Sequence, residues 1–330
     1  MSKKCNIYIT GSTGMIGLAL IRSLLLHDRD NQHLHLGRIF AIVREDSRKL
    51  DLLPKDDRIT IVPCDLDHLN QLPDILDRMG FHSTDRLRRR TNVFYHFGWD
   101  GTGGAANRAK TDVQYKNMKY TEYAVLAADK LGCGKFIGAG SQAEYGMCRD
   151  LPLRPDSEPH PISPYGSAKE LVGSFVLDFC RHRGIDGIWV RIFSVYGTHD
   201  RANSMVMSTL QKLKSGEKPL FTPAEQLWDY LNEEDAGNAF RMIGDLCTGS
   251  RIYCLASGES HPLKDYIDQI RDAVDPALPL GIGDLPYPDH GPRDLAADIS
   301  SLQKDTGWNP QISFAEGISE ILRSQSLKST

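Results

Sequence analysis

The sequence predicts an α/β protein with a doubly wound, parallel sheet and a smaller, interleaved C-terminal lobe. Two observations predict the sheet. Apolar, β-branched runs of strand length alternate with helical patterns over the first two-thirds of the chain, and a glycine-rich turn joins the first strand to the first helix. A third observation predicts the lobe, because prolines and loops become denser from about residue 196.

The glycine turn follows a predicted buried strand at residues 5–10 and precedes a predicted helix at residues 18–26, and its three glycines stand at three-residue spacing. Gly11 permits a tight turn, Gly14 lets a pyrophosphate approach the backbone, and Gly17 lets the helix pack close to the strand. The helix N-terminus offers free N–H groups and the positive end of its dipole to phosphates. An ordinary strand–turn–helix connection is the alternative, but the context of the motif favours a dinucleotide-binding Rossmann fold.

The remaining elements follow in order. Five further strands are predicted, at residues 38–44, 59–64, 92–98, 135–140 and 187–192. Helical patterns are predicted at residues 105–131, 164–182, 203–215, 233–246 and 263–274. We expect a dinucleotide-binding domain over residues 1–196, joined by late elements from about 226–256, and a mostly substrate-binding lobe over 197–330.

Composition excludes several classes of function. The chain has 330 residues, 40% of them hydrophobic and 25% charged, with a net charge of −4, so it lacks the overall basic charge typical of nucleic-acid-binding proteins. The basic run at residues 86–90 is predicted to be a solvated loop, with a local nucleic-acid patch as the alternative. No apolar run is long enough to span a membrane.

The seven cysteines show no paired metal-ligand spacing, so we expect no metal site and reduced thiols. The first residues, which include two lysines, do not resemble a signal peptide because only a strand-length apolar run follows them. We therefore expect a cytoplasmic protein.

Arg44 bears on the choice of cofactor. It stands at the carboxyl end of the second predicted strand, where dinucleotide-binding folds contact the adenosine ribose. An acidic residue there would bind the 2′-hydroxyl, whereas an arginine suits a 2′-phosphate. Arg44 therefore favours NADP(H) and leaves NAD(H) possible; the alternative is an arginine in a surface loop.

Tyr165 and Lys169 are the candidate acid/base pair. They lie four residues apart near the start of a predicted helix and so share one helix face. A phenol has an ordinary pKa of about 10, and a neighbouring ammonium should lower that pKa. The alternative is a solvated pair on a surface helix. Ser141, at the end of the fifth strand, could bind the same substrate oxygen, and Asn117 is an amide within a long helix, which needs a polar partner if it faces inward.

Taken together, these motifs resemble the extended short-chain dehydrogenase/reductases, in particular the NAD-dependent epimerase/dehydratase family that acts on nucleotide sugars. The resemblance covers nearly the whole chain. Its segments, in order, are the glycine turn, Asp65-Leu66, Asn117, Ser141, Tyr165, Lys169, residues 191–197, residues 226–230, residues 297–300 and residues 307–310.

The resemblance implies a role for each matching residue. Gly11, Gly14 and Gly17 would hold the pyrophosphate, and Asp65 and Leu66 would contact the adenine. Tyr165 would be the acid/base, Lys169 its partner and a ribose ligand, and Ser141 the hydroxyl that positions the substrate oxygen. Further cofactor contacts are expected from Thr13, Met15, Ile16, Phe97, Gly98, Asn117, Ile192 and Phe193. Substrate contacts are expected from Trp99, Ser141, Gln142, Ser194, His199, Trp228 and Arg293.

Departures from the family pattern narrow the reaction. Sugar 4,6-dehydratases of this family carry an acidic residue one or two positions after the catalytic Ser or Thr, where this chain has Gln142 and Ala143. Glu144 comes one position later and, by strand alternation, should point elsewhere. Dehydration is therefore disfavoured. A 4-keto reductase ranks first, a 4-epimerase with retained NAD stays close, and a non-catalytic NADP-sensing regulator represents a different class.

Three substrate-side residues keep alternative interpretations. His199 resembles the acid histidine of the epimerase-reductases that make fucose-type sugars. Those enzymes pair this histidine with a cysteine, which Ala143 replaces in this chain, so 3,5-epimerisation is disfavoured. His199 is then either a substrate contact or a loop residue without a direct role. Trp228 stands where many relatives have an arginine, and it either stacks on a pyrimidine base or is simply buried. Arg293 is a candidate diphosphate ligand.

Relatives also pair two long helices across a two-fold axis. The resemblance therefore implies a homodimer built as a four-helix bundle from residues 105–131 and 164–182.

Overall fold

The computed structural model describes residues 4–81, 91–102, 104–146, 150–287 and 293–327. Its centre is a seven-stranded sheet in the order β10-β6-β5-β4-β1-β2-β3, with every neighbouring pair parallel. The strands are β1 (Cys5–Thr10), β2 (Leu36–Val43), β3 (Ile59–Pro63), β4 (Asn92–His96), β5 (Cys133–Ser141), β6 (Asp186–Ile192) and β10 (Arg251–Leu255). The predicted doubly wound α/β fold is confirmed.

The order of the strands locates the ligand crevice. From β1 the chain winds outward through β2 to β3, then returns to the other side of β1 with β4 and continues to β10. The winding direction therefore changes between β1 and β4, and in such sheets ligands bind outside the carboxyl ends of the strands at this point. The six predicted strands are present within a few residues of their expected bounds, and β10 lies within the late elements expected at 226–256.

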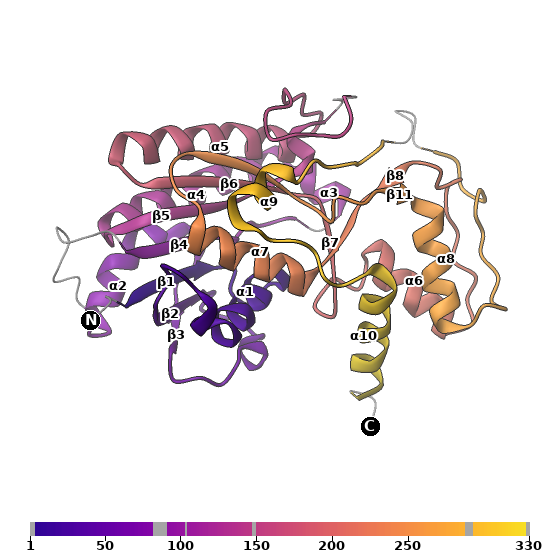
Figure 1. Ribbon diagram of the computed structural model, residues 1–330, viewed down its shortest axis with the longest axis horizontal. Coiled ribbons are helices and arrows are strands. Elements are labelled where there is room, and N and C mark those ends of the chain that lie inside the picture. Colours follow the sequence, from indigo (N-terminus) through magenta and orange to yellow (C-terminus); the bar gives the residue numbers. More distant parts are fainter. Residues whose placement is uncertain (1–3, 82–90, 103, 147–149, 288–292, 328–330) are drawn as a thin grey trace.

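Helices cover both faces of the sheet (Figure 1). One face packs against α1 (Met15–Leu26) and α7 (Glu233–Leu246), which also contact each other. The other face packs against α2 (Leu72–Arg78), α4 (Thr111–Lys130) and α5 (Pro164–Arg183). The two apolar clusters between sheet and helices form most of the core, as expected for a parallel sheet buried on both faces.

The helix predicted at residues 105–131 is interrupted. It consists of the short α3 (Ala105–Arg108) and α4, and Lys110 between them has an extended backbone with ψ of 105°. The Gln114 amide, one turn into α4, donates to the carbonyl of Asn107 in α3 and so holds the two pieces together. The periodicity of apolar side chains does not change at a single extended residue. The sequence pattern therefore predicted one continuous helix.

The C-terminal lobe has its own apolar cluster, which α6 (Met205–Lys214), α8 (Leu263–Val274) and α10 (Phe314–Leu327) form at one end of the molecule (Figure 1). Two short sheets connect it to the main domain, β7 (Ser194–Tyr196) with β9 (Tyr230–Asn232) and β8 (Leu227–Trp228) with β11 (His261–Pro262). The division near residue 196 stays a prediction, which this separate cluster supports.

The remaining elements are short. They are α9 (Ser300–Thr306) and four 3-10 turns, η1 (Asp28–Asp30), η2 (Leu50–Leu52), η3 (Leu66–Gln71) and η4 (Gln142–Glu144). The basic run at 86–90 and Cys148 lie outside the described residues. Within the described part of the chain, no helix combines the length and the apolar character needed to cross a bilayer.

Candidate active site

The glycine turn lies at the carboxyl end of β1, and its geometry requires glycine. Gly11 has a φ of +68°, and a Cβ there would lie 2.9 Å from the backbone nitrogen of Gly98. A Cβ at Gly17 would lie 2.3 Å from the carbonyl oxygen of Gly11, so α1 packs directly on the turn. Gly14 is the N-cap of α1 and provides no capping side chain, which leaves the first N–H groups of the helix without intrahelical acceptors.

This cradle fits a dinucleotide pyrophosphate, which needs close backbone approach and donors at a helix N-terminus. Thr13, Met15 and Ile16 lie half-buried along it. Sequence reasoning missed Ser12, whose buried hydroxyl donates to the carbonyl of Ile42 at 3.0 Å and ties the turn to β2. A serine within the glycine turn gives no signal of this role, because its partner lies on another strand.

The ends of β2 and β3 meet beside the cradle. The side chain of Arg44, directly after β2, is 68% exposed, and its Nε lies 3.9 Å from a carboxylate oxygen of Asp46. Asp65, two residues after the end of β3, accepts the backbone N–H of Glu45 at 3.1 Å and so joins the two strand ends. Leu66 packs so closely on Gly98 that a Cβ there would lie 2.6 Å from its methyl carbon. The structure thus brings Arg44, Asp65 and Leu66 to one edge of the crevice.

A buried hydrogen-bond chain holds the end of β4. The N–H of Gly98 donates to the Thr10 hydroxyl at 3.1 Å, which leaves that hydroxyl to donate to Nδ1 of His96 at 2.8 Å. His96 Nε2–H then donates to Thr121 at 3.1 Å, and Thr121 donates to the carbonyl of Asn117 at 3.0 Å. Burial lowers the pKa of His96 to about 3, so the imidazole is neutral. A lone histidine ending an apolar strand was the only signal of this chain of bonds.

The loop after β4 is fixed by side-chain amides. Asn117, only 1% exposed, accepts from the backbone N–H of Asp100 and donates to the carbonyl of the same residue, both at 2.8 Å. Its amide therefore faces inward and holds the loop, while its cofactor contact stays a prediction. Trp99 is buried and donates through Nε1 to Gln114 at 2.9 Å, and Phe97 packs edge-on against Phe240 at a centroid distance of 4.8 Å.

Ser141, Tyr165 and Lys169 come together at the carboxyl end of β5. Ser141 is the last residue of β5, and the other two lie one turn apart at the start of α5, whose N-cap Ser163 accepts the N–H of Gly166 at 3.1 Å. All three are less than 9% exposed. The Ser141 hydroxyl lies close enough to the Tyr165 phenol to lower the pKa of that phenol. The grouping expected from the sequence is therefore present.

The expected effect of Lys169 on the phenol is wrong for this chain. Burial raises the pKa of Tyr165 and outweighs the opposing effect of the Ser141 hydroxyl. Burial also lowers the pKa of Lys169, to about 7. The Lys169 ammonium donates to the carbonyl of Ala139 at 2.6 Å and lies 3.6 Å from the ring centroid of Trp99. The sequence spacing correctly placed the pair, but it could not reveal that both groups are desolvated.

Glu144 lies in the 3-10 turn η4, beyond the end of β5, so the strand alternation used in the sequence analysis does not apply to it; a buried network holds its carboxylate instead. One of its carboxylate oxygens accepts the backbone N–H of Ser141 at 2.7 Å and the indole N–H of Trp189 at 3.0 Å, and the other lies 2.8 Å from Nε of Arg191. The side chains of Glu144 and Arg191 are 1% and 6% exposed. This buried ion pair supports the backbone at Ser141, a role that sequence reasoning did not assign.

The predicted substrate residues follow β6. Ile192 ends β6, Phe193 donates its N–H to the carbonyl of Leu255 at 3.0 Å, and Ser194 begins β7. His199 is oriented by Glu233, since its Nδ1 lies 2.7 Å from a carboxylate oxygen of that buried residue.

Trp228 is half-buried against the apolar cluster of the lobe, at a centroid distance of 6.4 Å from Tyr230. Of its two interpretations, this position favours burial. Arg293 is half-buried, and burial lowers its pKa. Gln142 follows Ser141 in η4 and is also half-buried.

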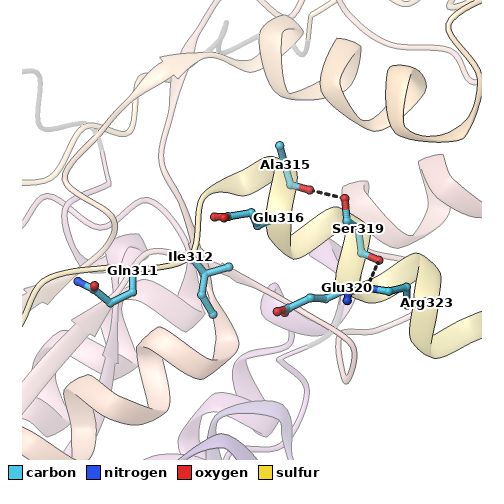
Figure 2. A pocket seen from close by; sticks show the side chains of 7 residues that line it. All are labelled: Gln311, Ile312, Ala315, Glu316, Ser319, Glu320 and Arg323. Atoms are coloured by element: carbon cyan, nitrogen blue, oxygen red, sulfur yellow. Dashed lines mark hydrogen bonds between the residues drawn. The ribbon is translucent and has the colours of Figure 1, made fainter.

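A separate hollow lies on α10 and the segment before it (Figure 2). There the Ser319 hydroxyl donates to the carbonyl of Ala315 at 2.9 Å, and Arg323 donates to the carbonyl of Ser319 at 3.4 Å. It contains none of the predicted site residues; its lining is Gln311, Ile312, Ala315, Glu316, Ser319, Glu320 and Arg323. Across the described residues, no group of three or more His, Cys, Asp or Glu side chains is placed to hold a metal ion.

Comparisons with curated proteins give relatives of several activities. A dTDP-4-dehydro-6-deoxyglucose reductase of Escherichia coli is 25% identical, covering 98% of both chains. A dTDP-glucose 4,6-dehydratase of Haemophilus influenzae is 21% identical, covering 96% of this chain and 97% of the relative. These relatives are nucleotide-sugar-modifying enzymes, and they differ in the reaction.

Solved structures share the fold. A UDP-N-acetylglucosamine 4-epimerase from Methanobrevibacter ruminantium, in complex with UDP-N-acetylmuramic acid, has a TM-score of 0.81 at 20% identity and covers 99% of both chains. A dTDP-glucose 4,6-dehydratase from Streptomyces venezuelae with NAD bound has a TM-score of 0.81 at 18% identity, covering 98% of this chain and 97% of the other. The model of the NAD dependent epimerase/dehydratase family matches residues 7–253, which is more than half of the chain. As the sequence motifs predicted, the chain belongs to the NAD-dependent epimerase/dehydratase family of extended short-chain dehydrogenase/reductases.

Proposed function

We propose that this protein reduces the 4-keto group of a nucleotide-activated 4-keto-6-deoxyhexose, with Tyr165 as the proton donor. The observation that carries the proposal is a buried phenol whose pKa is raised and which lies close to the Ser141 hydroxyl. A raised pKa keeps the phenol protonated at neutral pH, which suits an acid that protonates a carbonyl oxygen. The similarity to a reductase of E. coli, which aligns with 98% of this chain, also supports the proposal.

In this mechanism the nicotinamide, when bound, supplies the hydride. Tyr165 transfers its proton to the oxygen at C4 as the carbonyl becomes an alcohol, and Ser141 donates a hydrogen bond to the same oxygen. Lys169 is fixed by the carbonyl of Ala139 and by Trp99, and it would hold the ribose of a bound cofactor. The cradle of Gly11, Gly14 and Gly17 would hold its pyrophosphate.

Dehydration is disfavoured by the residues after Ser141. Gln142 and Ala143 carry no carboxyl group, and the carboxylate of Glu144 is occupied by Ser141, Trp189 and Arg191. No acid therefore stands one or two positions after the serine to assist loss of water. Substrate contacts are proposed for Trp99, Gln142, Ser194, His199 and Arg293.

A 4-epimerase with retained NAD is the second candidate. It is favoured by the environment of Arg44, because the guanidinium is mostly exposed and the nearby Asp46 offsets part of its charge. Such an arginine attracts a 2′-phosphate less strongly. NADP(H) remains our first proposal for the cofactor, and NAD(H) the alternative, which the NAD-bound neighbours support.

We also propose a cytoplasmic homodimer. The cytoplasmic setting is supported by six buried cysteines that form no disulfide within the described residues. The dimer is supported by exposed apolar side chains on the two helices expected to form a bundle: Tyr115 of α4 is 69% exposed, and Leu171 and Phe175 of α5 are 55% and 43% exposed.

The deciding experiment is to purify the protein, identify any dinucleotide that co-purifies and its redox state, and assay turnover of nucleotide-activated 4-keto-6-deoxyhexoses. Exchangeable NADPH that is consumed in step with substrate would support the reductase. Tightly held NAD with no net consumption would support the epimerase. Dinucleotide binding without turnover of any sugar substrate would contradict both and indicate a non-catalytic sensor.

A further inference from the structure

Two arginines from distant parts of the sequence meet at Thr102, in the loop between β4 and α3. Arg108, the last residue of α3, donates through Nε to the backbone carbonyl of Thr102 at 3.1 Å. Arg201, in the loop after β7, donates through an Nη2 hydrogen bond to the side-chain hydroxyl of the same residue. Thr102 therefore holds two guanidinium groups at one place, one through its backbone and one through its side chain.

This place adjoins the reacting phenol. The Cζ atom of Arg108 lies over the ring of Tyr165, 5.0 Å from its centroid. Burial raises the pKa of Tyr165, and the Ser141 hydroxyl lowers it. The positive charges of Arg108 and Arg201 make smaller contributions, and both lower this pKa. Both guanidinium groups are thus close enough to the active site to act on its chemistry.

Neither guanidinium forms an ion pair within the part of the chain that the structure describes, although burial raises the pKa of the neighbouring Asp200 carboxyl group and the charge of Arg201 opposes that rise. The arginines Arg22, Arg58 and Arg191 each lie 3.4 Å or less from an acidic oxygen, whereas Arg108 and Arg201 lie within 4.0 Å of none. Two like charges held at one residue repel each other, and an anion between them would remove that repulsion. The planar guanidinium fork is also the side chain best suited to bind phosphate or carboxylate oxygens in pairs.

We propose that Arg108, Arg201 and Thr102 form a subsite for an oxyanion of the substrate beside the carbon that reacts. This inference rests on the proposed function, since it takes the substrate to be a nucleotide sugar. In a nucleotide-activated 6-deoxyhexose the oxyanion is the diphosphate; a carboxylate on the sugar ring would make the substrate a nucleotide uronate and not the 6-deoxyhexose proposed above. Both sources share the chemistry that a guanidinium pair recognises, and they are separated by the choice of probe.

The test compares Arg108→Gln and Arg201→Gln with the wild-type protein by calorimetric titration. Saturating NAD⁺ is present throughout, so that the glycine turn is occupied. The probes are uridine, UDP, UDP-glucose and UDP-glucuronate, with dTDP and GDP to cover other bases. Arg181→Gln is the matched control, because Arg181 lies on the same helix as Tyr165 but at its far, exposed end. Circular dichroism and NAD⁺ affinity establish that each variant is folded.

If the subsite binds the diphosphate, each variant should weaken UDP binding about tenfold and leave uridine unchanged, as expected for loss of a charge-assisted hydrogen bond. If it binds a sugar carboxylate, only UDP-glucuronate should lose affinity. Arg201→Lys should restore part of the lost affinity, since it keeps the charge but not the fork.

The inference is overturned if the wild type binds UDP or its sugars and neither glutamine variant differs from Arg181→Gln. Failure of the wild type to bind UDP, dTDP and GDP alike would overturn the inference and the proposed function together. Retained probe binding with no turnover of any sugar would remove only the proposed reaction.

Discussion

The carboxylate of Glu144 accepts the backbone N–H of Ser141 at 2.7 Å, and Glu144 lies against Arg191 of β6 at 2.8 Å. The end of β5, which carries the candidate catalytic serine, is therefore fixed by a buried ion pair on the neighbouring strand. Trp189 adds a third donor to the same carboxylate. This arrangement turns a potential acid into a support for Ser141.

Glu144→Gln should destabilise the protein by about 3–5 kcal/mol, because it leaves the buried Arg191 without its countercharge. Urea unfolding of the two proteins measures the difference. Asp178→Asn is the matched control, because it removes a carboxylate from a surface ion pair with Arg181 in which both side chains are more than half exposed. This substitution should change the free energy of unfolding by less than about 1 kcal/mol. Equal stability of Glu144→Gln and wild type would show that the pair contributes nothing.

Tyr165→Phe should lower turnover at least about a hundredfold and leave dinucleotide binding unchanged, because it removes the proton donor but keeps the ring. Steady-state kinetics and a dinucleotide titration measure the two effects. Tyr115→Phe, an exposed tyrosine on α4, provides the control. Undiminished turnover in Tyr165→Phe would refute the role assigned to the phenol.

The buried Lys169 should make stability depend on pH. Its pKa is lowered to about 7 in the folded protein, against about 10.4 in an unfolded chain. Between these values the unfolded state binds more protons, so the wild type should gain stability as pH rises from about 7 towards 10. Below pH 7 both states hold the proton and the full cost of burying the charge remains.

Lys169→Met removes the titrating ammonium group. The free energy of unfolding of this variant, relative to that of the wild type, should therefore be greatest near pH 6 and should decline above pH 7. Urea unfolding at pH 6, 8 and 9.5 measures this difference, and groups that titrate equally in both proteins cancel. A difference that is the same at all three pH values would contradict the lowered pKa.

Arg44→Asp should shift the preference from NADP towards NAD, because it replaces a cation near the adenosine ribose with an acceptor for the 2′-hydroxyl. The ratio of the two dissociation constants is the quantity to measure. Arg48→Asp, four residues later and also exposed, makes the same charge change away from the strand end. If both variants shift the ratio equally, the effect comes from net charge and not from position 44.

Leu171→Glu combined with Phe175→Glu should convert a homodimer into a monomer, because both exposed side chains lie on the face of α5 expected to pair. Light scattering gives the mass. Leu26→Glu is the control, because Leu26 on α1 is 77% exposed and lies outside the two helices expected to pair. It should leave the mass unchanged. A wild-type protein that is already monomeric would count against the four-helix bundle.

The interruption of the helix predicted at residues 105–131 shows where sequence reasoning stops. The helical pattern correctly located α4 (Thr111–Lys130) within this range. It gave no sign of the extended residue Lys110, which is held by contacts between side chain and backbone across the break. Similarly, the helical pattern located the helix that carries Tyr165 and Lys169, and their spacing placed them on one face of it. Their desolvation, however, depends on Trp99 and on the end of β5.

The sequence by itself determined the parallel sheet, the glycine cradle and the grouping of Ser141, Tyr165 and Lys169, because each depends on local periodicity or on the known geometry of strand ends. Only the tertiary structure decided the direction of the two pKa shifts, the occupation of Glu144 by Arg191, and the meeting of Arg108 with Arg201. Burial and electrostatic interaction act between groups that are close in space, and separation along the chain does not encode that proximity.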